Sequence, residues 1–271
     1  MVSEVNRSSH RPIDLSDNGD RLEAMWIGPS PDTAPTLIFL HEGLGCAALW
    51  RDIPTRLVEM TGCGALVYSR LGYGASAPCT LPRPVDFMHH EGRGVLPDII
   101  RQCGIRDHLL IGHSDGGSIA LINAGANPAS GLAGVVTLAA HVFCEALTRS
   151  SIQAARRRYL DDDLKSRLAV YHGDNTDCAF WGWNDVWLHP DFIRWNIEEF
   201  LPTVKVPVLA IQGADDPYGT TAQIDSIRDG IGGRVDVHMV TGCGHEPHLE
   251  KRNIVLPVVC DFVQRVKSGL T

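Results

Sequence analysis

A serine flanked by small residues is the side chain of this sequence best suited to covalent chemistry. Ser114 lies in the run Gly-His-Ser-Asp-Gly-Gly, residues 112–117. An apolar run ends directly before it and a helix-compatible run follows, so the pattern predicts a strand, a tight turn and a helix with the serine at the apex. Side chains in place of the glycines would collide with the neighbouring strand or helix. A serine presented beside a helix N-terminus, where negative charge is stabilised, is typical of a nucleophile.

A serine hydroxyl becomes a good nucleophile when a general base takes its proton, and the base needs an acidic partner to fix its orientation. His245 is the candidate base, because it follows the last expected strand, residues 234–240, in a glycine-rich loop. Asp216 is the candidate acid, since it follows the strand expected at 206–212, and Asp215 is the alternative. An aspartate before proline is also common in turns, so turn formation is a second interpretation.

Other histidine pairs do not form a recognisable metal motif. His248 lies three residues after His245, but Pro247 between them prevents a helical pair of ligands, and no His-Glu-x-x-His motif occurs. The pair His89 and His90 has no evident third ligand. No Gly-x-Gly-x-x-Gly run follows an expected strand, and no phosphate-binding Gly-x-x-x-x-Gly-Lys loop occurs. We therefore expect neither a metal nor a cofactor.

Strand-like and helix-like stretches alternate along most of the chain. Apolar runs that predict buried strands lie at 36–41, 64–69, 108–112, 134–140, 206–212 and 234–240. Helices are expected at 48–61, 85–103, 115–126, 220–230 and 250–268. This alternation predicts an α/β fold, a mostly parallel sheet covered by helices on both faces. In such folds the functional site lies at the carboxyl ends of the strands, where Ser114, Asp216 and His245 are expected.

One interval breaks the alternation. Residues 141–202 contain no clear strand but hold four of the six tryptophans within 15 residues. We expect this interval to form a helical cap, inserted into a core built from residues 1–140 and 203–271. Trp181 and Trp183 are the candidate substrate-binding residues of the cap, because apolar side chains usually line small-ligand sites. The alternative is that these tryptophans only pack.

Composition narrows the partners. The chain has 271 residues, enough for one large α/β domain, and a net charge of −8. This charge disfavours nucleic acids and anionic membranes as partners. The eight cysteines form no Cys-x-x-Cys pair, the first 20 residues lack the apolar core of a signal peptide, and no apolar run could span a bilayer. We expect free thiols and a cytoplasmic location, and the sequence carries no signal for oligomeric state.

The order serine, aspartate, histidine resembles that of the α/β-hydrolase superfamily, in its serine hydrolase branch. The resemblance covers roughly residues 20–265. It rests on five segments in the family's order: 41–45 (HEGLG), 70–76 (RLGYGAS), 112–117 (GHSDGG), 213–216 (GADD) and 244–250 (GHEPHLE). It implies the α/β-hydrolase fold and two-step acyl transfer by a Ser114–His245–Asp216 triad through an acyl-enzyme.

The resemblance also implies an oxyanion hole made of two backbone N–H groups. One belongs to Asp115, after the nucleophile, and the other to Gly43 or Leu44, because Glu42 stands where the family usually has glycine. The Asp115 carboxylate either caps the following helix or faces the pocket and pairs with a cation. The Ser-Asp-Gly-Gly run resembles that of the valacyclovir hydrolase group, which implies an aspartate placed against a substrate amine.

These observations favour a hydrolase of small carboxylic esters. An acyl-CoA thioesterase is the first alternative, with the run 156–158 of three arginines as the only candidate phosphate-binding patch. A carbon–carbon bond hydrolase and a slow-turnover small-molecule receptor are the others. Dehalogenases and epoxide hydrolases of this fold use an aspartate nucleophile, so Ser114 argues against both.

Overall fold

An eight-stranded sheet runs through the computed structural model, which describes residues 8–16, 19–127 and 131–269. The first two strands of the order β1-β4-β6-β5-β7-β8-β9-β10 are antiparallel to their neighbours, and the others are parallel. The strands are β1 (Ser8–His10), β4 (Ala24–Ile27), β6 (Gly64–Tyr68), β5 (Thr36–Leu40), β7 (His108–His113), β8 (Leu132–Leu138), β9 (Val208–Gly213) and β10 (Val235–Val240). The expected parallel sheet is thus confirmed. A small second sheet pairs β2 (Ile13–Asp14) with β3 (Arg21–Leu22).

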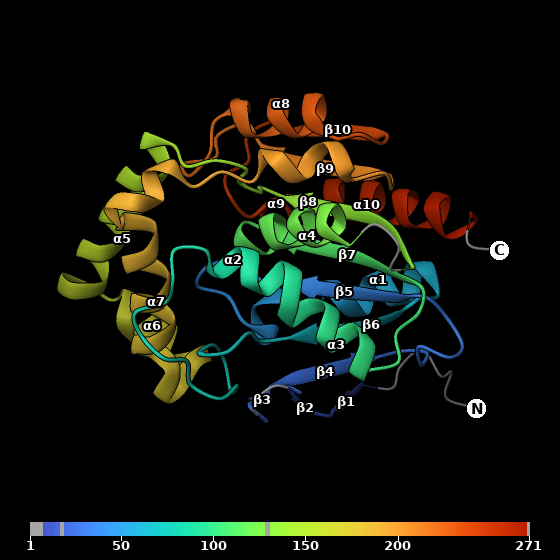
Figure 1. Cartoon of the computed structure of the whole chain (residues 1–271), viewed down its shortest axis with the longest axis horizontal. Helices are drawn as coiled ribbons and strands as arrows, with labels where there is room; N and C mark the ends of the chain where they lie inside the picture. The colour runs from blue at the N-terminus through green and yellow to red at the C-terminus, as the bar shows by residue number, and fades with distance from the viewer. Residues whose placement is uncertain (1–7, 17–18, 128–130, 270–271) are drawn as a thin grey trace.

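Helices cover both faces of the sheet (Figure 1). One face carries α1 (Ile53–Thr61) and α10 (Arg252–Lys267), and the other carries α2 (Phe87–His90), α3 (Leu96–Gln102), α4 (Asp115–Ala126) and α8 (Thr221–Gly230). Alternate residues of β5 point to the two faces. Leu37 and Phe39 pack in the core under α1 and α10, whereas Ile38 and Leu40 pack in the core under α4. Side chains of a strand point to opposite faces in turn, so a continuous apolar run needs both layers.

The segment expected as one helix at 85–103 is interrupted. It forms α2, a π-helical turn at Glu91–Val95 and then α3. Gly92 lies against α4, where an added Cβ would be 2.9 Å from the carbonyl oxygen of Ile119. Pro97 then opens α3. The close approach and the proline explain the break, because proline donates no hydrogen bond to the preceding turn.

The interval 141–202 contains three α-helices and no named strand. They are α5 (Ala146–Asp161), α6 (Leu164–His172) and α7 (Thr176–Leu188). Figure 1 shows them stacked together beyond one end of the sheet. The 3-10 turns Pro190–Arg194 and Glu198–Thr203 lead back to β9. Trp187, Phe192 and Trp195 pack together with ring centroids 4.7 to 5.6 Å apart, and they extend the apolar core on the α4 face of the sheet.

Two general features follow from the part of the chain that the structure describes. All eight cysteines are free thiols. Within the same residues no helix has both the length and the apolar character needed to cross a bilayer. The sheet therefore gains its stability from its two apolar layers rather than from disulfide bonds.

Gly116→Ala should destabilise the fold, because the new Cβ would lie 1.9 Å from the carbonyl oxygen of Leu40, a backbone atom. Overpacking of this kind lowers the free energy of unfolding by about 2 kcal/mol. Gly94→Ala is the matched control, since its Cβ would meet only the ring of His90 at 3.9 Å. Urea unfolding monitored by circular dichroism measures both. Equal stability of the two variants would contradict the close approach of α4 to β5.

Candidate active site

Ser114 occupies a strained turn between β7 and α4. Its backbone angles are φ 51° and ψ −118°, in a region that residues other than glycine rarely adopt. Two glycines allow the approach: a Cβ on Gly112 would lie 2.2 Å from the carbonyl oxygen of Gly116, and one on Gly116 would strike the end of β5. The Ser114 N–H donates to the carbonyl of Leu138, at 2.8 Å. Packing of three backbones thus holds the serine at the carboxyl edge of the sheet.

The structure pairs His245 with Asp216. The histidine Nδ1 lies 2.9 Å from both carboxylate oxygens, and the Tyr218 N–H donates to the same carboxylate at 2.8 Å. Burial alone would raise the pKa of Asp216, but these hydrogen bonds and the charge of His245 lower it, so the carboxyl stays ionised. Asp215, the alternative acid, is exposed and makes no hydrogen bond to His245. An ionised Asp216 fixes the Nδ1–H tautomer and leaves Nε2 free to accept a proton.

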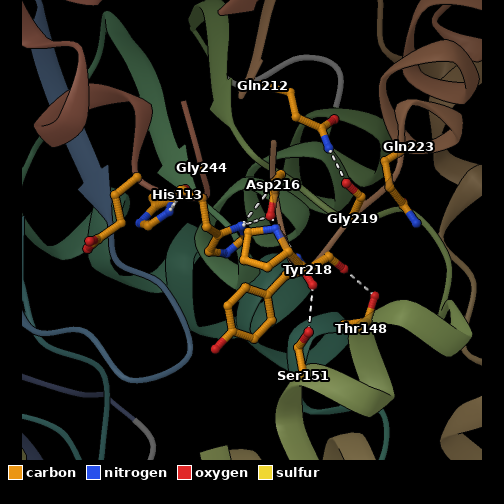
Figure 2. A network of polar contacts seen from close by, with 12 residues as sticks. His113, Thr148, Ser151, Gln212, Asp216, Tyr218, Gly219, Gln223 and Gly244 are labelled. Atoms are coloured by element: carbon orange, nitrogen blue, oxygen red, sulfur yellow. Dashed lines mark hydrogen bonds and ion pairs between the residues drawn. The ribbon is translucent and has the colours of Figure 1, made fainter. Parts of the chain in front are cut away.

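Helix α5 holds the loop that carries Asp216. Thr148 donates its hydroxyl to the carbonyl of Tyr218, and Ser151 donates to that of Pro217 at 2.6 Å. Figure 2 shows both contacts reaching from α5 to the loop beside Asp216. Helix α5 therefore helps to position the loop of the candidate acid.

The loop after β5 is held by a buried arginine. Arg70 donates to the carbonyls of His41 and Glu42, and its own N–H donates to the His41 ring at 3.0 Å. Among the described residues, the backbone N–H groups of Gly43 and Leu44 donate no hydrogen bond. Both residues line the cavity described below, so both N–H groups remain available as donors.

Two residues of the helical segment pack on this loop. A Cβ on Gly43 would lie 2.1 Å from the ring of Trp183, on α7. His172, at the end of α6, donates from Nε2 to the carbonyl of Leu44 at 3.0 Å, and its Nδ1 accepts from the N–H of Gly74. Glycine at position 43 is therefore needed for the approach of the tryptophan ring.

Most of the predicted site residues meet at one cavity of about 530 Å³, a size usual for small-ligand sites. Those that line it are Ser114, His245, Asp115, Gly43, Leu44 and Trp183. Asp216 lies behind His245. No hydrogen bond joins Ser114 and His245 in the described chain, which is common before a substrate binds. The cavity thus brings the candidate nucleophile, the candidate base and both candidate oxyanion loops together.

Trp181 is not brought to this cavity. It packs edge-on against Tyr159 and Phe180, with centroid distances of 5.6 and 5.0 Å, and the Arg156 guanidinium lies 5.2 Å over its ring. Residues two positions apart point to nearly opposite sides of a helix. Trp183 therefore faces the cavity, whereas Trp181 faces away from it. The expectation for Trp181 as a substrate contact therefore has no support in this geometry.

Asp115 is fully buried and its carboxylate does not cap α4. Oδ1 accepts from the indole N–H of Trp187 at 3.2 Å, and Oδ2 has no hydrogen-bond partner within the described residues. Burial raises the pKa of Asp115 to about 6, against the lowering effect of Arg70, Trp187 and His245. An unpaired carboxylate oxygen at a cavity is a site ready to accept a hydrogen bond or a positive charge.

The cavity also contains residues that the sequence reasoning did not assign. They include Glu42, His113, His141, Thr148, Trp187 and Tyr218. His141 is buried, and burial lowers its pKa to about 3, so it is neutral. It follows β8 closely, and the rule that sites lie at strand ends would have identified it. The described residues contain no group of three or more His, Cys, Asp or Glu side chains that could hold a metal ion.

Comparisons with known proteins agree with this architecture. The sn-1-specific diacylglycerol lipase ABHD11 of Xenopus laevis is 25% identical over 298 residues, covering 97% of this chain and 88% of that protein. The esterase EaEST from Exiguobacterium antarcticum superposes with a TM-score of 0.75 at 18% identity, over 94% of this chain and 100% of that one. Proline iminopeptidase from Mycobacterium smegmatis gives 0.73 at 20% identity, over 97% and 100%. The two solved structures show a shared fold.

The sequence pattern of the Alpha/beta hydrolase family decides the classification. It matches residues 37–255, which include the segments of Ser114, Asp216 and His245. The eight-stranded sheet with helices on both faces superposes on the esterase EaEST over nearly the whole chain. This protein is therefore a hydrolase that belongs to the alpha/beta hydrolase family.

Proposed function

We propose that the protein hydrolyses small carboxylic esters through Ser114, His245 and Asp216. The observation that carries the proposal is the Asp216–His245 pair, with Nδ1 2.9 Å from both oxygens, at the same cavity as a serine in a strained turn. The lipase and esterase names of the relatives above agree with an ester substrate. We further propose that residues 141–202 act as a cap, since helices α5, α6 and α7 contribute to the cavity.

The proposed reaction has two steps. His245 takes the Ser114 proton as Oγ attacks the ester carbonyl, and the developing oxyanion accepts hydrogen bonds from the N–H of Asp115 and of Gly43 or Leu44. His245 then protonates the departing alcohol. A water molecule, deprotonated by His245, attacks the acyl-enzyme and releases the acid. Asp216 stabilises the imidazolium in both steps.

Charge at the cavity disfavours an acyl-CoA thioester. The lining has no lysine or arginine but five carboxylates: Glu42, Asp115, Asp215, Glu246 and Glu250. Arg156 is turned to Asp185, at 3.7 Å, and to Trp181. Phosphates of coenzyme A would meet repulsion rather than ion pairs. The same acidity, together with the unpaired Asp115 oxygen, favours an ester that carries an ammonium group.

A carbon–carbon bond hydrolase and a slow receptor use the same fold and remain the alternatives. Neither is favoured by a feature of the described residues. Turnover separates them from an esterase, because a receptor hydrolyses far less than one bond per minute, and a carbon–carbon hydrolase needs a ketone substrate.

Wild-type protein should hydrolyse at least one member of an ester panel, and Ser114→Ala should abolish this turnover. The panel contains p-nitrophenyl esters of graded acyl length, an amino-acid ester and an aryl-CoA thioester. Loss of a triad residue typically costs ~10⁴-fold or more in kcat. Spectrophotometric initial rates measure the effect. A Ser114→Ala variant as active as the wild type would refute the proposal.

Asp115→Asn should weaken hydrolysis of a cationic ester roughly tenfold to a hundredfold relative to a neutral ester of the same shape, because a charge-assisted contact of ~1.5–3 kcal/mol is lost. The wild-type preference should also depend on pH. Since the pKa of Asp115 is about 6, the preference is present above pH 6 and fades below it, as the carboxyl gains its proton. Matched kcat/KM measurements test both. Equal losses of kcat/KM for the two esters would contradict the proposal that the substrate carries an ammonium group.

Asp115→Asn should also stabilise the fold above pH 6. The folded-state pKa of about 6 exceeds the reference value of 3.8, so ionisation destabilises the folded protein, fully above pH 6 and not at all below 3.8. That difference corresponds to about 3 kcal/mol, of which we expect ~1–2 kcal/mol to be recovered, because the hydrogen bond from the Trp187 indole N–H is weaker to a neutral amide oxygen than to a carboxylate. Urea unfolding at pH 8 and pH 4 measures it. A destabilised variant at pH 8 would contradict the buried, costly charge.

A further inference from the structure

A single buried imidazole joins the three loops that carry the proposed reaction. His113 ends β7, directly before Ser114. Its Nε2 lies 2.8 Å from the backbone carbonyl of His245, and its Nδ1 lies 3.3 Å from Glu42 Oε2. Figure 2 shows His113 beside the Gly244 end of the histidine loop. The turn of Ser114, the loop of His245 and the proposed oxyanion loop therefore all contact this one side chain.

The partners of His113 determine its protonation state. Both ring nitrogens face acceptors, the Glu42 carboxylate and a carbonyl, and Glu42 has no proton to give because its pKa is strongly lowered. A neutral imidazole has one N–H and would leave a lone pair pointing at one of these oxygens. Only the doubly protonated ring satisfies both. His113 is 1% exposed, so an unsatisfied pair there would be costly.

Charges around the ring agree with this state. Burial by itself would lower the pKa of His113, but the hydrogen bond and charge of Glu42, with help from the His245 carbonyl and Glu246, raise it. The three neighbouring histidine rings are His245, His248 and His141. Burial lowers the pKa of His248 and His141, so both are neutral. Glu42 keeps a strongly lowered pKa despite burial, because it faces His113.

We propose that Glu42 and His113 form a second carboxylate–histidine pair, in which the ring is a resting imidazolium, and that this pair positions the His245 loop and the oxyanion loop for hydrolysis. The pair is distinct from Asp216–His245, because it contacts a backbone carbonyl and no reacting atom. Glu42 also packs over Gly45, where an added Cβ would collide with its carboxylate. A shift of Glu42 therefore moves the loop of Gly43 and Leu44. This inference rests on the proposed function for its catalytic consequence, but not for the existence of the pair.

The pair makes the site sensitive to alkaline pH. Once His113 loses its proton, its lone pair faces either the Glu42 carboxylate or the His245 carbonyl, and one of the two loops is released. Glu42→Gln removes this conflict, since an amide N–H can donate to a neutral Nδ1 while Nε2–H still donates to His245. The substitution therefore removes the charge and keeps the contacts.

Nitrogen-15 NMR of the histidine rings tests the pair without any substrate. Wild-type protein at pH 7 should give an imidazolium signal that is absent from His113→Leu. In Glu42→Gln the same ring should be neutral at pH 7. Glu246→Gln is the matched control: it removes a carboxylate that faces His113 without a hydrogen bond, so the ring should stay doubly protonated. A neutral His113 in the wild type at pH 7 overturns the proposal.

The pH profile of kcat tests the positioning role on any ester that the wild type hydrolyses. We expect the wild type to lose activity on the alkaline side, and Glu42→Gln to lack this loss. His113→Leu should lower kcat about tenfold, the usual effect of losing a charge-assisted hydrogen bond, with a nearly unchanged KM. A Glu42→Gln profile with the same alkaline midpoint overturns the role. If the wild type hydrolyses no ester, the proposed function fails, and the NMR result alone decides whether the pair exists.

Discussion

The close packing of three backbones around Ser114 is the constraint on which the site depends. The start of α4, the end of β7 and the end of β5 approach so closely that Gly112 and Gly116 admit no side chain. This packing holds the serine at a positive φ of 51°. Strain of that kind costs about 1–3 kcal/mol and persists only where the surroundings enforce it. The two layers of apolar side chains on either face of the sheet provide that enforcement.

Around this fixed point, the other loops are held by buried polar side chains rather than by their own secondary structure. Arg70 engages the carbonyls of the loop after β5, and α5 engages the loop of Asp216. Such contacts are strong in a buried setting and costly when incomplete. One carboxylate oxygen of Asp115, by contrast, has no hydrogen-bond partner among the described residues. Under the proposed function, the buried Asp115 carboxylate lowers the stability of the fold but allows the cavity to recognise a positively charged group.

Sequence patterns predicted the fold well because apolar periodicity and glycine spacing report local physics. The run Thr36–Leu40 and the glycines around Ser114 determine their own elements. The acid was narrowed to two neighbours, and only the three-dimensional turn distinguishes Asp216 from Asp215. Contacts between residues far apart in the chain could not be predicted, because no local sequence pattern encodes them. Trp181 and Trp183 look alike in sequence, and the Glu42–His113 contact joins residues 71 positions apart. Which of these residues contacts the cavity depends on which side of its helix or loop faces the cavity.

Mass spectrometry of the protein after reaction with a fluorophosphonate tests the central claim most directly. The reagent reacts with serines that a base activates and an oxyanion hole supports, whatever the natural substrate. One adduct per chain is expected, mapped by peptide fragmentation to Ser114 and lost in His245→Ala. An unlabelled wild-type protein, or an adduct on another residue, would contradict a catalytic Ser114.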